Sequence, residues 1–272
     1  MRWLLPRGRN HSTLKNGHLF LSYYNTNYIQ IEIKIKMEKT SYIVMFTLGM
    51  TVLVALLLSG LFYGTKDQVA QNEDVFNKRA ILSAISDKLD KPVGDFSDAE
   101  VLSIFEEKME QKVLSMDGGE IEGVLAEDVD MEQEMKKAES NRQLPLFVFN
   151  AGKEKIYIVS VRGSGLWDAI WGNIALEDDF NTVIGAAFDH KQETPGLGAE
   201  IKDNPVFARN FKGKKIYKDG EYVSINVQKG GAKDMQHDVD GISGATVTAN
   251  GVDEMLYRGI KYYEPYFQKT KG

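Results

Sequence analysis

The hydrophobic pattern divides the chain into one long apolar stretch near the N-terminus and a longer segment of mixed, periodic composition. Residues 41–64 read SYIVMFTLGMTVLVALLLSGLFYG, and no charged residue occurs from Thr40 to Thr65. As a helix this stretch would extend about 36 Å at roughly 1.5 Å per residue, enough to cross a hydrocarbon core of about 30 Å. Because it has no polar face and no clear cleavage site follows it, a transmembrane helix is favoured over a buried helix or a cleaved signal peptide.

Charge around this stretch predicts its orientation. Residues 1–40 hold seven Lys or Arg and two Asp or Glu, whereas the rest of the chain is acidic. Lys34, Lys36 and Lys39 precede the apolar stretch. The positive-inside rule then places a tail of residues 1–40 in the cytoplasm and everything after Lys66 outside. We expect a single-pass protein of the inner (cytoplasmic) membrane with a periplasmic or equivalent domain.

The first 36 residues differ from the rest of the chain. They are rich in Asn and Tyr, show no clear periodicity and precede a second methionine, Met37. A start at Met37 would give MEKTSYIVMF, a short basic segment leading into an ordinary anchor. We therefore interpret residues 1–36 as a start-site artefact or a disordered tail, with the true start at Met1 or Met37 left open.

Helical periodicity follows the anchor. Apolar residues recur at helical spacing over 67–91, which predicts a connecting helix within residues 65–95. Ser97 and Glu100 have the spacing of a capping box, and the apolar face behind them predicts a helix that reaches Val113. The acidic run from Glu120 to Lys137 indicates a solvated excursion rather than a site.

The pattern becomes β-rich from Leu144. Residues 144–150 and 155–163 predict a hairpin, residues 169–177 and 181–190 two more strands, and residues 221–228 a further strand. Apolar positions on one face of 246–268 predict a C-terminal helix. Residues 96–272 are therefore expected to form an α+β domain, a mostly antiparallel sheet with helices packed against it, behind the single transmembrane helix.

Composition excludes several kinds of site. The sequence contains no cysteine, so disulfides, thiolate zinc sites, cysteine-ligated iron–sulfur clusters and cysteine nucleophiles are all excluded. A net charge of −6 argues against a nucleic-acid-binding protein, which would normally present a basic face. Redox chemistry in this chain would need a cofactor that does not depend on cysteine.

The string DGISGATVT at residues 240–248 is the most informative motif. Small residues let a bulky ligand approach the backbone, and the free N–H groups of a helix start attract phosphate. Ser243 or Thr246 could equally serve only as the cap of the following helix. The residues alone leave helix capping and a phosphate-linked ligand as open alternatives.

Two other strings could carry chemistry. HKQETPGLG at residues 190–198 contains a Pro-Gly turn after a strand, and GSGLW at residues 163–167 places Trp167 in core or rim packing or against a flavin. His190 and Glu193 are weak as a metal pair, and His237 is the only other histidine after the anchor, so no metal site is predicted. No G-x-G-x-x-G string opens a helix after a strand, which excludes a dinucleotide fingerprint.

These motifs together resemble a known family. SGATVT at residues 243–248 is similar to the flavinylation motif of FMN-binding domains, in which the final hydroxyl residue carries FMN through a phosphoester. HKQETPGLG and GSGLW resemble further stretches of the same domains. With the single N-terminal anchor, the resemblance covers about residues 37–271 and extends to the C subunits of sodium-translocating NADH:quinone reductases. The G subunits of Rnf electron-transport complexes share the domain and are the nearest alternative.

The resemblance implies a set of cofactor-binding residues. Thr248 would be the attachment point of covalent FMN, with Ser243, Gly244, Ala245 and Thr246 forming the turn around it. The residues expected near the flavin are Glu193, Thr194 and Leu197, with Trp167 close by and Lys229 as a further candidate. A threonine hydroxyl is a poor nucleophile without a base, so attachment should need a separate flavin transferase.

The resemblance also implies a function. The chain would be a membrane-anchored electron-transfer subunit, relaying electrons from NADH toward quinone (ubiquinone) within a multi-subunit, sodium-translocating respiratory complex. It would not be catalytic alone, since it lacks an NADH fingerprint and one apolar span provides no sodium path. The alternative is an Rnf-type subunit, or an exported FMN-binding or sensory domain without electron relay. A protein that purifies within a stable membrane complex would be a relay subunit, whereas one that purifies alone would be a sensory domain.

Overall fold

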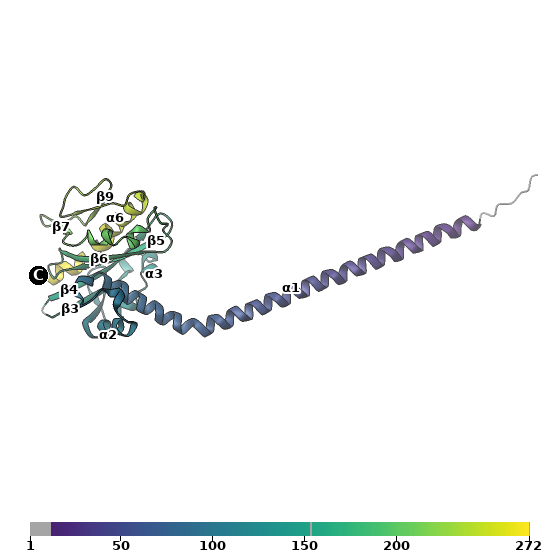
Figure 1. Ribbon diagram of the computed structural model, residues 1–272, viewed down its shortest axis with the longest axis horizontal. Coiled ribbons are helices and arrows are strands. Elements are labelled where there is room, and N and C mark those ends of the chain that lie inside the picture. The colour runs from purple at the N-terminus through teal and green to yellow at the C-terminus, as the bar shows by residue number, and fades with distance from the viewer. Residues whose placement is uncertain (1–11, 153, 272) are drawn as a thin grey trace, which may run out of the picture. The chain divides into compact units, whose positions relative to one another are not determined.

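The computed structural model describes residues 12–152 and 154–271, and this part of the chain divides into two units after Ala70. The N-terminal unit is part of one helix, α1 (Ser12–Ser83), shown in Figure 1. Residues 12–36, for which the sequence shows no periodicity, belong to this helix. The choice between Met1 and Met37 as the start stays a prediction, and residues 1–11 lie outside the described residues.

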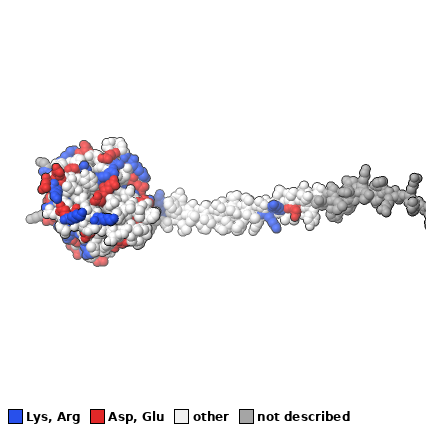
Figure 2. Space-filling view, turned by 90° about the horizontal axis from the view of Figure 1, so that it is seen from above, with Lys and Arg blue, Asp and Glu red and all other residues white. Residues whose placement is uncertain are grey.

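Among the described residues, one helical segment is long and apolar enough to cross a membrane. It runs from Tyr28 to Ser83, its most apolar window has a mean hydropathy of 2.3, and none of that window is buried. Side chains such as Leu56 and Leu61 are about two-thirds exposed, at 67% and 66%. Figure 2 shows a stretch of this helix without acidic or basic side chains, bounded by charged residues at both ends. This helix supplies the membrane anchor that the apolar pattern predicts.

The second unit is built on a six-stranded antiparallel sheet of order β2-β1-β3-β4-β5-β6. The α+β prediction is confirmed, and so are the hairpin β3–β4 and the strands β5 and β6. The strands of the sheet are β1 (Met109–Ser115), β2 (Glu120–Ile121), β3 (Gln143–Ala151), β4 (Glu154–Ser164), β5 (Ala169–Leu176) and β6 (Val183–His190).

Shorter elements surround the sheet. Helices and 3-10 turns of the second unit are η1 (Ser86–Lys88), η2 (Val93–Asp95), α2 (Asp98–Lys108), η3 (Ala126–Asp128), α3 (Met131–Lys136), η4 (Glu139–Asn141), α4 (Glu200–Asp203), α5 (Pro205–Arg209), α6 (Thr246–Lys261) and α7 (Glu264–Lys271). Two small sheets pair β7 (Tyr217–Lys218) with β8 (Glu221–Tyr222), and β9 (Asn226–Gln228) in parallel with β10 (Asp238–Asp240).

Alternating strand residues give the sheet two apolar faces and therefore two cores. Helix α6 packs on one face, where a Cβ added at Gly163 of β4 would stand 2.7 Å from the Cβ of Met255. The end of α1 and α2 cover the other face through Leu82, Phe105 and their neighbours. Figure 1 shows α6 and α2 on opposite sides of the strands. This arrangement fixes the start of α6 beside the ends of β4 and β6.

Two predicted elements have other limits in the structure than the sequence pattern predicts. The helix after Ser97 has the expected capping box but ends at Lys108, and Met109 and Val113 lie on β1. A spacing of four residues fits one face of a helix or of a strand, so the pattern could not separate them. Residues 221–228 form two short strands rather than one, because Ser224 between them has a φ of +65°.

The C-terminal helix predicted over 246–268 is two helices, α6 and α7. Pro265 has no backbone N–H, and its ring clashes with the carbonyl four residues earlier in a continuous helix. The predicted connecting helix is the end of α1, which continues to Ser83 without a break after the apolar stretch. It is followed by the short turn η1.

Candidate functional site

Three loops that carry the sequence motifs meet at one carboxylate. Glu193 lies in the loop after β6, and its side chain reaches the β4–β5 connection and the first turn of α6. The carboxylate accepts the backbone N–H groups of Leu166 at 3.1 Å and Trp167 at 2.9 Å. It also accepts the hydroxyl of Thr248 at 2.5 Å. The residues drawn from GSGLW, HKQETPGLG and SGATVT are therefore joined through Glu193.

Glu193 is ionised in a buried position. Only 5% of the residue is exposed. Burial opposes the charge, but the hydrogen bonds from Thr248 and the backbone N–H groups outweigh it and hold the pKa of Glu193 below its usual range. The charged form is thus stabilised by donors from two other segments of the chain.

Thr248 occupies the third position of α6 and is fully buried, with an exposed fraction of 0%. Besides Glu193, its hydroxyl faces the carbonyl of Leu197 at 3.1 Å. Since a hydroxyl has one proton, the two acceptors share it. The loop at residues 194–198 therefore covers the threonine that the resemblance selects.

Two glycines make this close approach possible. A Cβ at Gly198, whose φ is +151°, would stand 2.3 Å from the Thr248 Oγ1. A Cβ at Gly165 would stand 2.6 Å from Glu193 Oε1. Neither contact is tolerated by a real Cβ, so any larger residue at these positions would separate the three loops.

The start of α6 lacks a side-chain cap. Ala245 is the N-cap residue, and no side chain accepts a hydrogen bond from the first turn, which also contains no acidic residue. The alternative that Ser243 or Thr246 caps this helix is therefore wrong, and both residues are exposed. Together with Gly244, whose φ is +85°, they form a turn of small residues at a free helix start. Such a start attracts a phosphate group.

The outer members of the predicted set surround this centre. Trp167 is 64% exposed, which excludes core packing and leaves rim packing or a contact with the flavin. Leu197 in the covering loop is 42% exposed and Val247 in the first turn of α6 is 53% exposed, which leaves apolar side chains at the surface on both sides of Thr248. Thr194 is also exposed, and its carbonyl accepts the N–H of Leu197 at 2.9 Å within the covering loop.

Lys229 directly follows β9 and lies near the start of the DGISGATVT string. The carbonyl of Gln228, its neighbour, accepts the N–H of Gly241 at 2.8 Å, and Gly241 lies in the DGISGATVT string. The side chain of Lys229 is exposed. The structure thus brings the backbone beside Lys229 to the start of the motif.

Two further residues shape the covering loop and were not predicted. Glu200 accepts the N–H of Gly198 at 3.1 Å and that of Gly196. The Gly196 N–H, more than any other group, holds the pKa of Glu200 below its usual value. His190 accepts the N–H of Glu193 on Nδ1 at 3.1 Å, while its Nε2 is buried without a partner among the described residues. An acidic residue just after a glycine-rich turn is the signal that could have identified Glu200.

A cavity of about 410 Å³ adjoins the GSGLW loop. Trp167 and Lys191 line one part of it, and Glu132 and Lys136 from the predicted solvated excursion line another. Glu132 also pairs with Arg162 at 3.1 Å. The acidic run thus contributes one wall beside the motif loops. Within the described residues, no group of three or more His, Asp or Glu side chains is arranged to hold a metal ion.

Comparisons with known proteins identify the kind of domain that contains this site. The model of the FMN-binding domain family matches residues 165–261. The crystal structure of the C subunit of Na(+)-translocating NADH-quinone reductase from Parabacteroides distasonis is similar at a TM-score of 0.66 and 37% identity, covering 74% of this chain and 96% of that one. NqrC from Shewanella oneidensis is similar at a TM-score of 0.62 and 26% identity, covering 74% of this chain and 98% of that one.

Sequence relatives give the same result, one of them over most of the chain. The C subunit of Na(+)-translocating NADH-quinone reductase from Neisseria meningitidis serogroup B is 26% identical over 259 residues, covering 87% of this chain and 97% of that protein. The Vibrio anguillarum protein of that name is 42% identical over 117 residues, covering 42% of this chain and 46% of that protein.

Proposed function

Because this chain belongs to the family of Na(+)-translocating NADH-quinone reductase C subunits, we propose that Thr248 carries its FMN and that the loops around Glu193 hold the flavin. The chain is a membrane-anchored, FMN-binding electron-transfer subunit of that reductase, an oxidoreductase complex of several subunits. The resemblance to the C subunits is thereby confirmed, and the Rnf-type and sensory alternatives are not favoured. Bound FMN supplies the ability to accept and pass on electrons, which the cysteine-free protein itself lacks.

The residues at the start of α6 fit the phosphate of FMN. The uncapped first turn, without an acidic residue, offers N–H groups and the positive end of the helix dipole to an anion. Ser243, Gly244, Ala245 and Thr246 would form the turn around that phosphate. Their small side chains leave the backbone accessible to it, which is the single observation that carries this assignment.

Glu193, Thr194, Leu197, Trp167 and Lys229 would orient the rest of the flavin. Exposed apolar surface on Trp167 and Leu197, at 64% and 42%, offers the isoalloxazine ring a face to lie against. Glu193 would fix the loops that present these side chains, through its bonds to the Leu166 and Trp167 N–H groups.

Covalent attachment would need a separate flavin transferase. The Thr248 hydroxyl is a weak nucleophile, and it is fully buried under the loop at residues 194–198. The hydrogen bond to the Leu197 carbonyl must therefore open before the oxygen can be esterified. An enzyme that binds this loop in an open state would supply both access and activation.

Attachment is tested by mass spectrometry of the natively matured protein. Trypsin should release residues 234–258, which contain all three candidate hydroxyls, Ser243, Thr246 and Thr248. We expect this peptide to carry FMN less one water in wild type and to be bare in Thr248→Ala, with Thr246→Ala as the matched control that keeps the adduct. Fragment ions that place the adduct on Thr246 or Ser243, or a Thr248→Ala chain that retains full in-gel flavin fluorescence, would refute the assignment.

The orientation of the domain is a second part of the proposal. Lys34, Lys36 and Lys39 precede the apolar stretch, so the N-terminus lies in the cytoplasm and the FMN domain lies on the periplasmic side of the inner membrane. We further propose residues 41–64 as the membrane span and 65–95 as the connection to a domain at 96–272. Protease added to sealed spheroplasts should cut the domain, and protection until lysis would contradict this orientation.

A further inference from the structure

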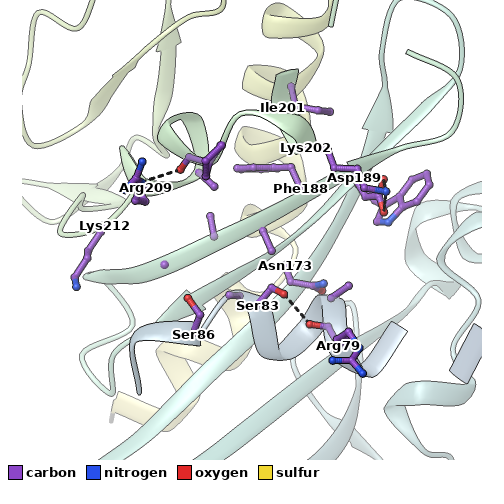
Figure 3. A pocket seen from close by; sticks show the side chains of 18 of the residues that line it. Arg79, Ser83, Ser86, Asn173, Phe188, Asp189, Ile201, Lys202, Arg209 and Lys212 are labelled. Atoms are coloured by element: carbon purple, nitrogen blue, oxygen red, sulfur yellow. Dashed lines mark hydrogen bonds and ion pairs between the residues drawn. The ribbon is translucent and has the colours of Figure 1, made fainter. Parts of the chain in front are cut away.

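The outer edge of the sheet carries a cavity that the FMN site does not use. Strand β6 is the last strand and pairs only with β5. A cavity of about 550 Å³ lies beside β6, and its volume is within the range of about 300–1,000 Å³ typical of ligand sites. Figure 3 shows Ser83 and Ser86 from the end of α1 and η1 on one side of the strand, and Lys202 and Arg209 from α4 and α5 on the other. The strand edge thus forms the floor of a groove with two walls.

The backbone of this edge has unpaired hydrogen-bonding groups. Alternate residues of an antiparallel strand direct their N–H and C=O groups to opposite sides. The N–H of Lys191 donates to the carbonyl of Ala169 across the β5–β6 pair at 3.0 Å, so Ala187 and Asp189 also face β5. The intervening residues of β6, Ala186 and Phe188, therefore face the cavity.

Ala186 and Phe188 are 8% and 7% exposed, and no group among the described residues pairs with their outward backbone atoms. Unpaired N–H and C=O groups in a buried strand are costly, and nearly all such groups in proteins have a partner. Two adjacent donor–acceptor pairs at the spacing of a strand are what an additional strand binds.

Both ends of the free edge are closed by the chain itself. At one end the Val183 N–H donates to the carbonyl of Lys214 at 2.8 Å, and the Gly213 N–H donates to the Val183 carbonyl at 2.8 Å. At the other end the His190 N–H donates to Asp189 Oδ1 at 2.7 Å. The open part is therefore a short slot between these closures rather than a continuous edge.

We propose that this slot binds an extended, acidic segment of a partner subunit of the reductase, which adds a strand beside β6. The cavity is lined by four cationic and two acidic side chains, so its charge favours a negative ligand. Three of these cations are already paired, Arg79 with Asp98, Lys202 with Asp189 and Lys212 with Asp87. Arg209 has no carboxylate partner among the described residues, so it is the lining cation that a negative ligand would meet. Membership of a multi-subunit complex supplies the partner, and the proposal does not depend on FMN attachment at Thr248.

Amide hydrogen exchange tests the main-chain bonds directly. The full chain alone in detergent is compared with the chain in the purified complex. We expect the Ala186 and Phe188 amides to exchange about tenfold slower or more in the complex. The Ala187 and Asp189 amides, which bond to β5, are the internal control and should be slow in both samples. Equal rates for Ala186 and Phe188 in both samples, or protection already present in the isolated chain, would overturn the proposal.

Charge reversal and cross-linking test the nature of the occupant. Arg209→Glu should weaken the association of this chain with the complex by about fivefold or more. Lys261→Glu makes the same charge change at an exposed position of α6 and should leave the association unchanged. Because the chain has no cysteine, Ser86→Cys gives a unique position for a photo-cross-linker in native membranes, with Ser140→Cys as control. An acidic segment of another subunit supports the proposal. A second copy of this chain, a lipid, or the same adducts from Ser140→Cys would overturn it.

Discussion

Removal of the Glu193 carboxylate tests whether one side chain holds the site together. Glu193→Ala deletes the acceptor of the Leu166 and Trp167 N–H groups and one of the two acceptors of the Thr248 hydroxyl. The hydroxyl keeps the Leu197 carbonyl at 3.1 Å. The loss therefore falls mainly on the Leu166 and Trp167 backbone donors, with a longer bond from the Asp168 N–H at 3.4 Å, and these donors have no other partner among the described residues.

The expected cost follows from those donors. A fully buried donor that loses its partner costs about 1–3 kcal/mol, but Leu166 and Trp167 are 37% and 64% exposed, so water can partly replace the carboxylate. Glu193→Ala should therefore lower the free energy of unfolding by about 2–4 kcal/mol, in the lower part of the range for two donors. Glu193→Gln keeps the shape and one acceptor oxygen but loses the charge-assisted bonds, and should cost about 1–2 kcal/mol. Glu254→Ala, which removes an exposed carboxylate paired with Arg258, should cost less than about 0.5 kcal/mol.

Urea unfolding of the flavin-free full chain in detergent, followed by near-ultraviolet circular dichroism, measures these differences. Combining Glu193→Ala with Thr248→Val should cost less than the sum of the single changes, because both remove the same hydrogen bond. If Glu193→Ala costs no more than Glu254→Ala, or if the two changes are additive, Glu193 does not join the loops as described.

The same carboxylate should make stability depend on pH. The pKa of Glu193 is lowered in the folded chain, so its contribution is present above the unfolded-state pKa of about 4.3 and is lost as the pH falls through the folded-state value. Unfolding midpoints of Glu193→Gln should therefore decline less than those of wild type as the pH falls below about 4.3. Parallel declines would show that the Glu193 carboxylate is not the titrating group.

Two further substitutions test the covering loop and the helix cap. Gly198→Ala should destabilise the chain by about 1–3 kcal/mol in urea unfolding and lower in-gel flavin fluorescence, because its Cβ would stand 2.3 Å from Thr248 Oγ1. Gly213→Ala, at a positive φ in open space, should keep the fluorescence, and equal loss in both would point to backbone strain alone. Ser97→Ala removes the capping box of α2 and should lower the free energy of unfolding by about 1 kcal/mol. Ser103→Ala, within the same helix, is the control and should cost less than about 0.5 kcal/mol. Equal costs would contradict the capping role of Ser97.

The fold could be predicted where local pattern and tertiary environment agree. The hairpin of β3 and β4 and the capping box at Ser97 both depend on contacts within a few residues. The positions at which α2, β8 and α6 end depend on more than this local pattern. Met109 lies in β1 rather than in the helix because it pairs with Phe149 of β3, forty residues later. The spacing of apolar residues within one segment cannot reveal a partner so far along the chain.

The site was predicted as a set of residues but not as an arrangement. The motifs named Glu193 and Thr248, whereas their hydrogen bond joins positions 55 residues apart. Neither the burial of Thr248 nor the role of Glu200 follows from spacing. Both depend on a loop that folds back over α6, and the conformations of Gly196 and Gly198 that allow this are set by the packing of that loop.

The closed ends of β6 have a consequence for unassembled copies of the chain. A long unpaired edge lets identical sheets join side by side and aggregate. Here the pairing of Val183 with Gly213 and Lys214, and the bond from His190 to Asp189, leave the outward groups of Ala186 and Phe188 without a partner among the residues that the structure describes. Because the chain closes both ends of this slot, the long edge of another sheet does not fit along it, and a short segment that enters has little freedom to shift its register. Newly made copies can thus remain separate in the membrane until assembly.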